Sequence, residues 1–414
     1  MTRRLLTRAS LALALGGWLG GCITPAPRAP FHIPAAQLPK KDYYATLPAG
    51  EHALRKITDP SQLPPLSAGL AYRQGLKESV ARSLHYLAKP SSKGFFPISG
   101  IEHRQVVASL EVFAELLDRD LSDLELAAEL RRRFDVYTTV GCDGEGTVLF
   151  TGYYTPIFEA SRTRTGEFQH PLHRLPVGHE KDPISGKTLG LRQPDGSLQT
   201  DYPTRDELLA GHLLDGRELV YLRDPFEAYV IGVQGSAILR LRDGSFLEVG
   251  YAGNNGHEYA SLGAALVAAG KMKKEELNLR NMIAYFQAHP EEFAPLAANN
   301  ERYVFFQEGA GGPFGCLNEK VEAMRTIATD KEIFPRGALC FLEASLPLEV
   351  AKDGQGVYHG FALDQDAGGA IRAPGRCDVY MGVGEEAGEL AGHTWAEGRL
   401  YYLILKDGEE LARR

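Results

Sequence analysis

Apolar residues recur at helical spacing in the stretch from residue 76 to residue 133. This i, i+3/i+4 pattern predicts two amphipathic helices. A third helix is expected after Ser122, because Glu125 stands at the position of its capping-box partner. We expect the three helices to cover one side of a sheet. The apolar positions of the first two are Leu76, Val80, Leu84 and Leu87, then Val106, Leu110, Phe113 and Leu117.

The hydrophobic pattern then changes to the alternation that is typical of strands. Strands are predicted over 134–140 and 147–154, on either side of a turn at Asp143-Gly144. A hairpin is predicted over 238–251, because alternating apolar residues flank Asp243-Gly244, a strong two-residue turn signal.

The last part of the chain consists mostly of short apolar runs. Two further helices are expected, over 261–269 and about 274–288. Short strands with many turns favour a closed barrel over a doubly wound sheet. The predicted class is therefore mainly β with peripheral helices. The clearest late strands are 338–344, 357–363, 378–381 and 400–405.

The first residues have the form of a secretory signal. Arg3, Arg4 and Arg8 precede a short apolar run at 9–19, which ends in small residues before Cys22. This ending resembles the lipobox of bacterial lipoproteins, in which the chain is cut before a cysteine that then carries lipid. We therefore expect a signal peptide at 1–21 and lipidation at Cys22; the alternative is an ordinary signal peptide. Ile23 in place of aspartate favours the outer membrane, facing the periplasm.

Residues 22–75 are expected to form a lipidated, proline-rich tether. Nine prolines fall between residues 23 and 65, which excludes a long helix there. Ordered contacts are expected only around Tyr43 and Tyr44.

Composition excludes several classes of function. The formal net charge of −8 and the absence of a basic run argue against a nucleic-acid partner. The body of the chain contains no Cys-x-x-Cys pair, so no structural metal site is expected. Disulfides among the four cysteines of the body and four reduced thiols both remain open; these residues are Cys142, Cys316, Cys340 and Cys377.

The stretch DQDAGGAI at 364–371, followed by RCDVYMG at 376–382, carries the strongest candidate chemistry. Asp366 and Asp378 are separated by a glycine-containing loop that is long enough to bring both carboxyls together. Paired carboxyls are the usual means of breaking a glycosidic bond, with one of them kept protonated near neutral pH. Taken alone, an aspartate beside a glycine more often belongs to a turn.

The same stretch resembles the C-terminal three-aspartate module of the membrane-bound lytic murein transglycosylase A family. Other segments resemble that family in the same order along the chain. They are FTGYYTP at 150–156, TRDE at 204–207, GVQGS at 232–236, YAGNNGH at 251–257, YVFF at 303–306 and GVGEEAG at 382–388.

The resemblance implies a double-psi β-barrel with a smaller β-rich domain inserted into it and a substrate groove between the two. The barrel domain would comprise residues 76–155 and 308–414, with the catalytic module at 340–405. The inserted domain would comprise residues 156–307.

The resemblance also implies a peptidoglycan lyase. The β-1,4 bond between N-acetylmuramic acid and N-acetylglucosamine would be cut without water, leaving a 1,6-anhydro end. Asp378 would act first as general acid and then as base, since the nucleophile is the substrate's own C6 hydroxyl. Asp366 and Thr151 would support it. No cofactor or metal is implied.

Further roles follow from the same resemblance. Gln234 and one of the pair Tyr153 and Tyr154 would contact the glycan, because neighbouring strand residues face opposite sides. Asp364 resembles a third acidic position. The expected partners are peptidoglycan strands, the outer membrane and cell-wall synthesis machinery.

We assign no catalytic role to two residues that lie within or beside the motifs. His257 has no serine or cysteine nucleophile beside it in the motifs, so we interpret it as structural or glycan-facing. Cys377 is next to Asp378, but cleavage of a glycan needs no thiol.

Two other functions remain as alternatives. One is a glycoside hydrolase that uses Asp366, Asp378 and water. The other is a non-catalytic lipoprotein that binds the cell wall.

Overall fold

The computed structural model describes residues 41–409, apart from 184–185, 274–275, 278 and 348–355. The signal peptide at 1–21, Cys22 and the first part of the expected tether lie outside the described residues. Among the helices that are described, none combines the length and the apolar character needed to cross a membrane.

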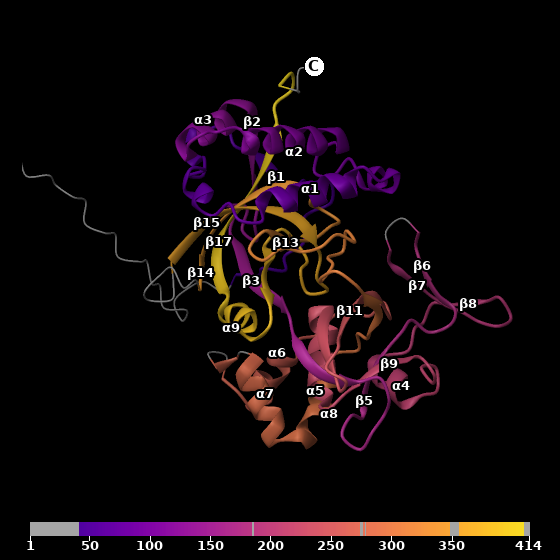
Figure 1. The fold of residues 1–414 in the computed structure, drawn as a ribbon. Helices are drawn as coiled ribbons and strands as arrows, with labels where there is room; N and C mark the ends of the chain where they lie inside the picture. The colour runs from indigo at the N-terminus through magenta and orange to yellow at the C-terminus, as the bar shows by residue number, and fades with distance from the viewer. Residues whose placement is uncertain (1–40, 184–185, 274–275, 278, 348–355, 410–414) are drawn as a thin grey trace, which may run out of the picture. The chain divides into compact units, whose positions relative to one another are not determined.

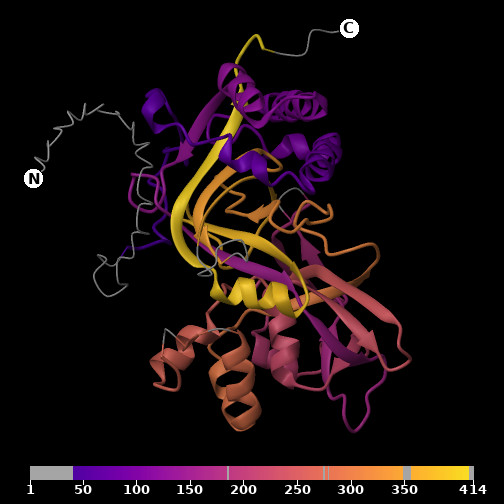
Figure 2. The ribbon, with the colours of Figure 1, turned by 60° about the vertical axis from the view of Figure 1, so that its left-hand side comes forward.

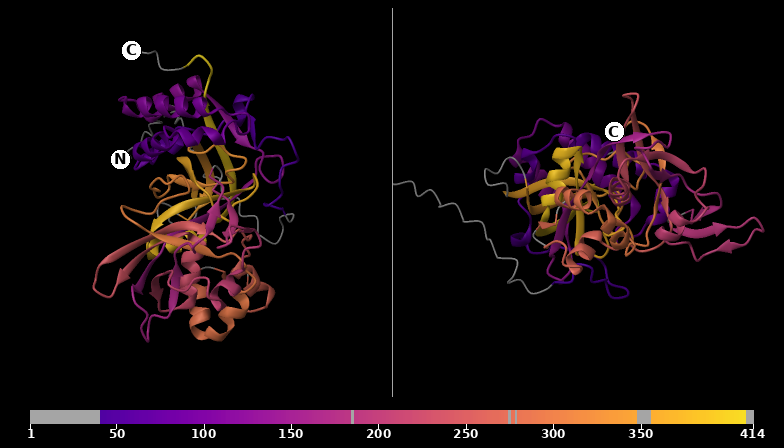
Figure 3. Two further views of the ribbon diagram at one scale, coloured as in Figure 1. Left: turned by 90° about the vertical axis from the view of Figure 1, so that its right-hand side faces the viewer. Right: turned by 90° about the horizontal axis from the view of Figure 1, so that it is seen from below.

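Three helices pack on the large sheet, as the apolar periodicity predicts (Figures 1 and 3). They are α1 (Leu76–Leu87), α2 (His103–Asp118) and α3 (Asp123–Arg133). Helix α1 contacts β15, and α2 contacts β14 and β17. The capping box at the start of α3 is confirmed, because the Ser122 hydroxyl accepts from the Glu125 amide and the Glu125 carboxylate accepts from the Ser122 amide.

Eight strands form the large sheet, in the order β1-β2-β17-β14-β15-β13-β16-β3. A further pairing of β17 with β3 closes six of them into a ring, from β17 through β14, β15, β13 and β16 to β3. Figure 2 shows the long curved β17 in yellow. The expected closed barrel is thus present. The strands are β1 (Leu54–Lys56), β2 (Phe134–Thr139), β3 (Val148–Thr155), β13 (Thr326–Ala328), β14 (Leu339–Leu346), β15 (Gly356–Asp366), β16 (Arg376–Val383) and β17 (Trp395–Leu405).

A second sheet has six strands, in the order β12-β11-β10-β4-β9-β5. Strand β3 of the barrel leads through Pro156 directly into β4 of this sheet. The predicted hairpin is confirmed as the antiparallel pair β10–β11. The strands are β4 (Ile157–Ser161), β5 (His170–His173), β9 (Glu218–Leu222), β10 (Ser236–Leu241), β11 (Phe246–Asn254) and β12 (Val304–Gly309).

Smaller elements accompany the second sheet in the sequence. A three-stranded sheet comprises β6 (His179–Lys181), β7 (Thr188–Arg192) and β8 (Leu198–Gln199). The helices are α4 (Arg205–Ala210), α5 (Pro225–Gln234), α6 (Leu262–Ala268), α7 (Leu279–Ala288) and α8 (Phe293–Ala297). Helix α9 (Glu385–His393) follows β16 and packs on β3.

Helices and strands together make this a mixed α/β structure with more strand than helix, so the prediction "mainly β" understates the helical part. The barrel and helices α1–α3 share one hydrophobic core, which includes Phe113, Phe341 and Tyr402. Strands of the second sheet enclose another, which includes Leu239 and Phe306.

The expected tether at 22–75 needs correction over its described part. Strand β1 pairs with β2, and Leu66 and Leu70 are buried in the barrel core. Short 3₁₀ turns at Pro60–Gln62 and Ala68–Ala71 accommodate the prolines. The few apolar residues of this stretch therefore pack against the barrel, although the local sequence has no regular period.

The structure also answers the open question about cysteines. Cys316, Cys340 and Cys377 have free thiols, so none of the three pairings among the four body cysteines is present.

Candidate active site

Asp378 lies within β16, between β3 and β13. In the parallel register its partner is Thr151, whose hydroxyl donates a short hydrogen bond to Oδ1 of Asp378. The Asp378 side chain is 18% exposed. Burial raises the pKa of Asp378 to about 6, Arg376 opposes this shift, and Asp366 adds to it. This carboxyl can therefore hold a proton close to neutral pH.

Asp366 lies at the end of β15 and accepts three hydrogen bonds. Its Oδ2 accepts from the Tyr153 hydroxyl at 2.7 Å. Its Oδ1 accepts from the backbone amides of Cys316 and Ala367, each at 2.8 Å. Burial raises the pKa of Asp366, and the bond from Tyr153 is the strongest opposing influence. The two aspartates thus differ in their surroundings. Asp366 accepts from three donors, whereas Asp378 is the carboxyl that is better suited to carry a proton.

Arg376 stands two residues before Asp378 on the same strand. Its Nη2 donates to the Thr151 hydroxyl at 2.9 Å and lies 3.7 Å from Oδ1 of Asp378. Its Nη1 donates to the Tyr44 hydroxyl at 2.7 Å. A buried cation therefore borders the candidate acid.

The two neighbouring tyrosines of β3 lie in different surroundings. The Tyr153 hydroxyl meets Asp366, and its ring packs against that of Tyr380 with centroids 5.1 Å apart. Tyr154 is buried in the barrel core. Of the two, the structure brings Tyr153 to the aspartates.

Gln234 is the last residue of α5 and reaches across to β3. Its Oε1 accepts from the backbone amide of Tyr154 at 3.1 Å. The side chain therefore joins α5 to the strand that carries Thr151 and Tyr153.

Asp364 is fully buried, and its carboxylate shares no hydrogen-bond partner with the carboxylate of Asp366 or Asp378 among the described residues. It accepts from Thr329 at 2.8 and 2.9 Å and from Tyr402 at 2.8 Å, and forms a short ion pair with Lys331. These contacts make Asp364 part of the barrel interior.

His257 and Cys377 have structural surroundings. His257 is bonded to the Tyr202 carbonyl at 2.7 Å and to Glu301 at 3.2 Å. It lines a cavity of about 200 Å³ together with Thr188 and Asp201. Cys377 is fully buried, and burial raises the pKa of its thiol.

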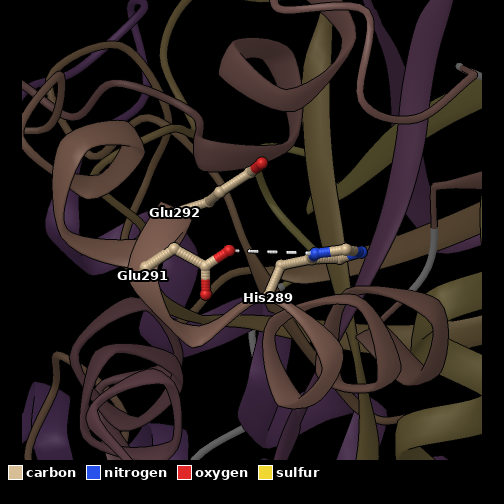
Figure 4. A group of neighbouring side chains, drawn as sticks. All are labelled: His289, Glu291 and Glu292. Carbon is tan, nitrogen blue, oxygen red and sulfur yellow. Dashed lines mark ion pairs between the residues drawn. The ribbon is translucent and has the colours of Figure 1, made fainter.

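Among the residues that the structure describes, one group of side chains has the spacing of metal ligands, namely His289, Glu291 and Glu292 (Figure 4). Both oxygens of Glu292 already have partners, since Lys271 bonds to one at 2.7 Å and Tyr285 donates to the other. The Glu292 carboxylate is therefore already paired with an ammonium group.

Two residues of the site, Arg376 and Tyr44, received no role from the sequence motifs. Arg376 was recognisable in principle, because residues two apart on a strand share a face with each other. Tyr44 is 332 positions away in the sequence from Arg376, and no local pattern connects the two.

Two protein families match the chain. Residues 149–307 match the MltA specific insert domain, and residues 325–404 match the 3D domain. The first range contains Thr151, Tyr153 and Gln234, and the second contains Asp366 and Asp378.

Two relatives that match most of the chain are described as membrane-bound lytic murein transglycosylase A. The chain is 34% identical over 282 residues to the membrane-bound lytic murein transglycosylase A of Escherichia coli K12, covering 66% of this chain and 70% of the relative. It is 29% identical over 277 residues to the protein of that name from Vibrio cholerae, covering 64% and 68%.

Solved structures share the fold. A membrane-bound lytic murein transglycosylase from Agrobacterium tumefaciens superposes with a TM-score of 0.72 at 24% identity, over 85% of this chain and 98% of that one. Escherichia coli MltA with bound chitohexaose superposes with a TM-score of 0.64 at 24% identity, over 88% and 97%.

Proposed function

This chain belongs to the MltA family, and from that premise we propose that it is a lytic murein transglycosylase that acts on peptidoglycan. The barrel would have the double-psi connectivity of the family. Its domain would comprise residues 76–155 and 308–414, with residues 156–307 inserted and the glycan lying in a groove between the two.

The proposed reaction is an intramolecular displacement. Asp378 protonates the glycosidic oxygen as the bond between N-acetylmuramic acid and N-acetylglucosamine breaks. Its carboxylate then takes the proton from the muramic acid C6 hydroxyl, which closes the 1,6-anhydro ring on C1. The observation that carries this proposal is the position of Asp378, which is largely buried beside Thr151 and Arg376 and whose pKa burial raises to about 6. A carboxyl that titrates there can serve as acid and as base near neutral pH.

Asp366 is proposed to support Asp378 electrostatically. Its negative charge raises the pKa of Asp378 and would favour the oxocarbenium-like transition state. Because its oxygens are occupied by the Tyr153 hydroxyl and two backbone amides, Asp366 is poorly placed to activate a water molecule. This favours the lyase over the hydrolase.

Glycan contacts are proposed for Tyr153 and Gln234. The Oε1 of Gln234 accepts from Tyr154, but no described residue accepts from its amide nitrogen. That nitrogen is therefore left to donate to a sugar hydroxyl or acetamido oxygen. The chitohexaose bound to Escherichia coli MltA supports a glycan as ligand. Tyr154 would act through its backbone, since its ring belongs to the core.

The proposed location is the periplasmic face of the outer membrane, with the chain anchored by lipid on Cys22 after removal of residues 1–21. The relatives are named membrane-bound, which supports an anchor. Cell-wall synthesis machinery is the proposed protein partner.

Digestion of purified peptidoglycan by the wild type and by Asp378→Asn tests the function. We expect the wild type to release fragments with 1,6-anhydromuramic acid ends, and Asp378→Asn to lose at least about 100-fold in rate, the usual contribution of a general acid. Mass spectrometry of the products gives both answers.

Asp118→Asn is the matched control, because Asp118 is an exposed aspartate of α2 whose partner is Lys77. Reducing muramic acid ends would indicate hydrolysis and reject the lyase. Binding without release of fragments would indicate the cell-wall-binding lipoprotein.

A further inference from the structure

We propose that Arg376 is a positioning residue for Asp378, acting through the Thr151 hydroxyl, and that Tyr44 of the N-terminal segment holds Arg376 in place. This inference rests on the proposed role of Asp378 as general acid and base. It adds to the site one residue from β16 and one from a part of the chain outside both matched families.

The guanidinium of Arg376 is fixed by few contacts. The residue is only 4% exposed. Nη2 donates to Thr151 and Nη1 to Tyr44, while Nε is buried and has no partner among the described residues. The orientation of this buried cation therefore depends on the two hydroxyls.

The contact with Arg376 determines what Thr151 can do. A threonine hydroxyl has one hydrogen to donate and accepts through its oxygen. Because Arg376 donates to that oxygen, the hydrogen is directed to Oδ1 of Asp378. When Asp378 is protonated, its proton then belongs on Oδ2, the oxygen that does not accept from Thr151. Arg376 thus selects which carboxyl oxygen carries the catalytic proton.

Tyr44 belongs to a short segment that is attached to the barrel at two points. Besides the bond from Arg376, the Tyr44 ring lies beside the guanidinium, 5.1 Å from ring centroid to Cζ. The preceding Tyr43 donates to Glu397 of β17 at 2.7 Å. Gly375 permits the close approach, since a Cβ there would lie 2.9 Å from the Tyr43 carbonyl oxygen.

The charged groups around Asp378 affect its pKa, which can be measured through the pH dependence of the rate. Arg376 lowers and Asp366 raises the pKa of Asp378. Of the other titratable groups nearby, Tyr153 is bonded to Asp366, and burial raises the pKa of the Tyr259 phenol and of the neighbouring Cys377 thiol. Loss or displacement of the Arg376 charge therefore raises the pKa of Asp378, so its acid form persists to higher pH.

The test is the pH dependence of kcat/KM for release of anhydro fragments, measured on the full chain with Arg376→Gln, Arg376→Lys, Tyr44→Phe and Tyr43→Phe. We expect Arg376→Gln to lower the maximal kcat/KM by about tenfold or more. The alkaline limb, the fall of kcat/KM at high pH as Asp378 loses its proton, should move to higher pH. Arg376→Lys keeps the charge and should return the limb towards the wild-type position.

Tyr44→Phe removes one hydroxyl and should move the limb in the same direction by a smaller amount. Tyr43→Phe removes the neighbouring hydroxyl, whose partner is Glu397, and should leave the limb where it is. Thermal unfolding of each variant separates a shifted limb from a damaged fold.

An unchanged limb in both Arg376→Gln and Tyr44→Phe would overturn the inference, as would equal shifts in Tyr44→Phe and Tyr43→Phe. Failure of the proposed function has a different signature, because Asp378→Asn would then retain activity whatever the Arg376 variants do.

Discussion

At the scale of single residues, Asp378 holds a proton more tightly than an ordinary aspartate because it is largely removed from water. Its pKa of about 6 compares with an ordinary value of 3.8. Between these two pH values the folded chain binds more protons at this position than the unfolded chain does. Stability therefore falls as pH rises through this window, and above it the buried charge remains a cost to folding.

Asp378→Asn is accordingly expected to stabilise the protein near pH 7.5 while it lowers the rate of the proposed reaction. The gain should approach about 2–3 kcal/mol, the equivalent of two pKa units, and should fall to about 0.5 kcal/mol near pH 4, where folded Asp378 is neutral and the unfolded aspartate is only partly ionised. Urea unfolding at the two pH values measures this, with Asp118→Asn as the exposed control. A variant no more stable than the wild type at pH 7.5 would contradict it.

The sequence motifs singled out four residues that the structure brings together, and their roles stay predictions. Asp366, Asp378, Thr151 and Tyr153 all meet in the structure. Asp364 does not join them, because its carboxylate is satisfied by Lys331, Thr329 and Tyr402 in the barrel interior. Nothing in the spacing of Asp364 and Asp366 reveals that these two residues face different surroundings.

At the scale of elements, helix α3 is defined by a local signal. Ser122 and Glu125 satisfy each other's backbone amides at its first turn. Ser122→Ala leaves one of these amides without its partner and should lower the free energy of unfolding by about 1 kcal/mol. Urea unfolding measures the loss. Ser91→Ala is the control, because Ser91 is exposed and no hydrogen bond of its side chain appears among the described residues; equal losses in both variants would argue against the cap.

Elements with such local signals were predictable, and those that depend on distant partners were not. The capping box of α3 and the turn at Asp243-Gly244 in the β10–β11 hairpin are both present. The segment around Leu66 and Leu70 was misjudged as a tether, because its order comes from the barrel core and not from its own period. The pairing of β17 with β3, which closes the ring, likewise joins strands that are far apart in the sequence.

At the scale of the whole molecule, the two large sheets have separate hydrophobic cores. Leu239 is fully buried in the second sheet and Leu342 is fully buried in the barrel. Separate cores permit separate local unfolding. The two sheets are therefore expected to lose protection independently.

Leu239→Ala should cost about 2–5 kcal/mol locally and should speed hydrogen exchange in β4 and β9–β12, with the barrel strands little changed. Leu342→Ala, the matched variant in the other core, should produce the reverse pattern. Hydrogen-exchange mass spectrometry resolves the two. Uniform acceleration across both sheets in either variant would mean that the molecule unfolds as a single unit.

The contact between Tyr44 and Arg376 has a practical consequence for protein production. Secreted proteins are often expressed from shortened genes that discard the leader and any stretch thought to be a linker. A version beginning at Ala45 would keep every strand of the barrel ring, yet it would lack the phenol that accepts from Arg376. If the proposed role of Arg376 holds, such a preparation would show a displaced pH optimum, so a shortened version should begin before Asp42.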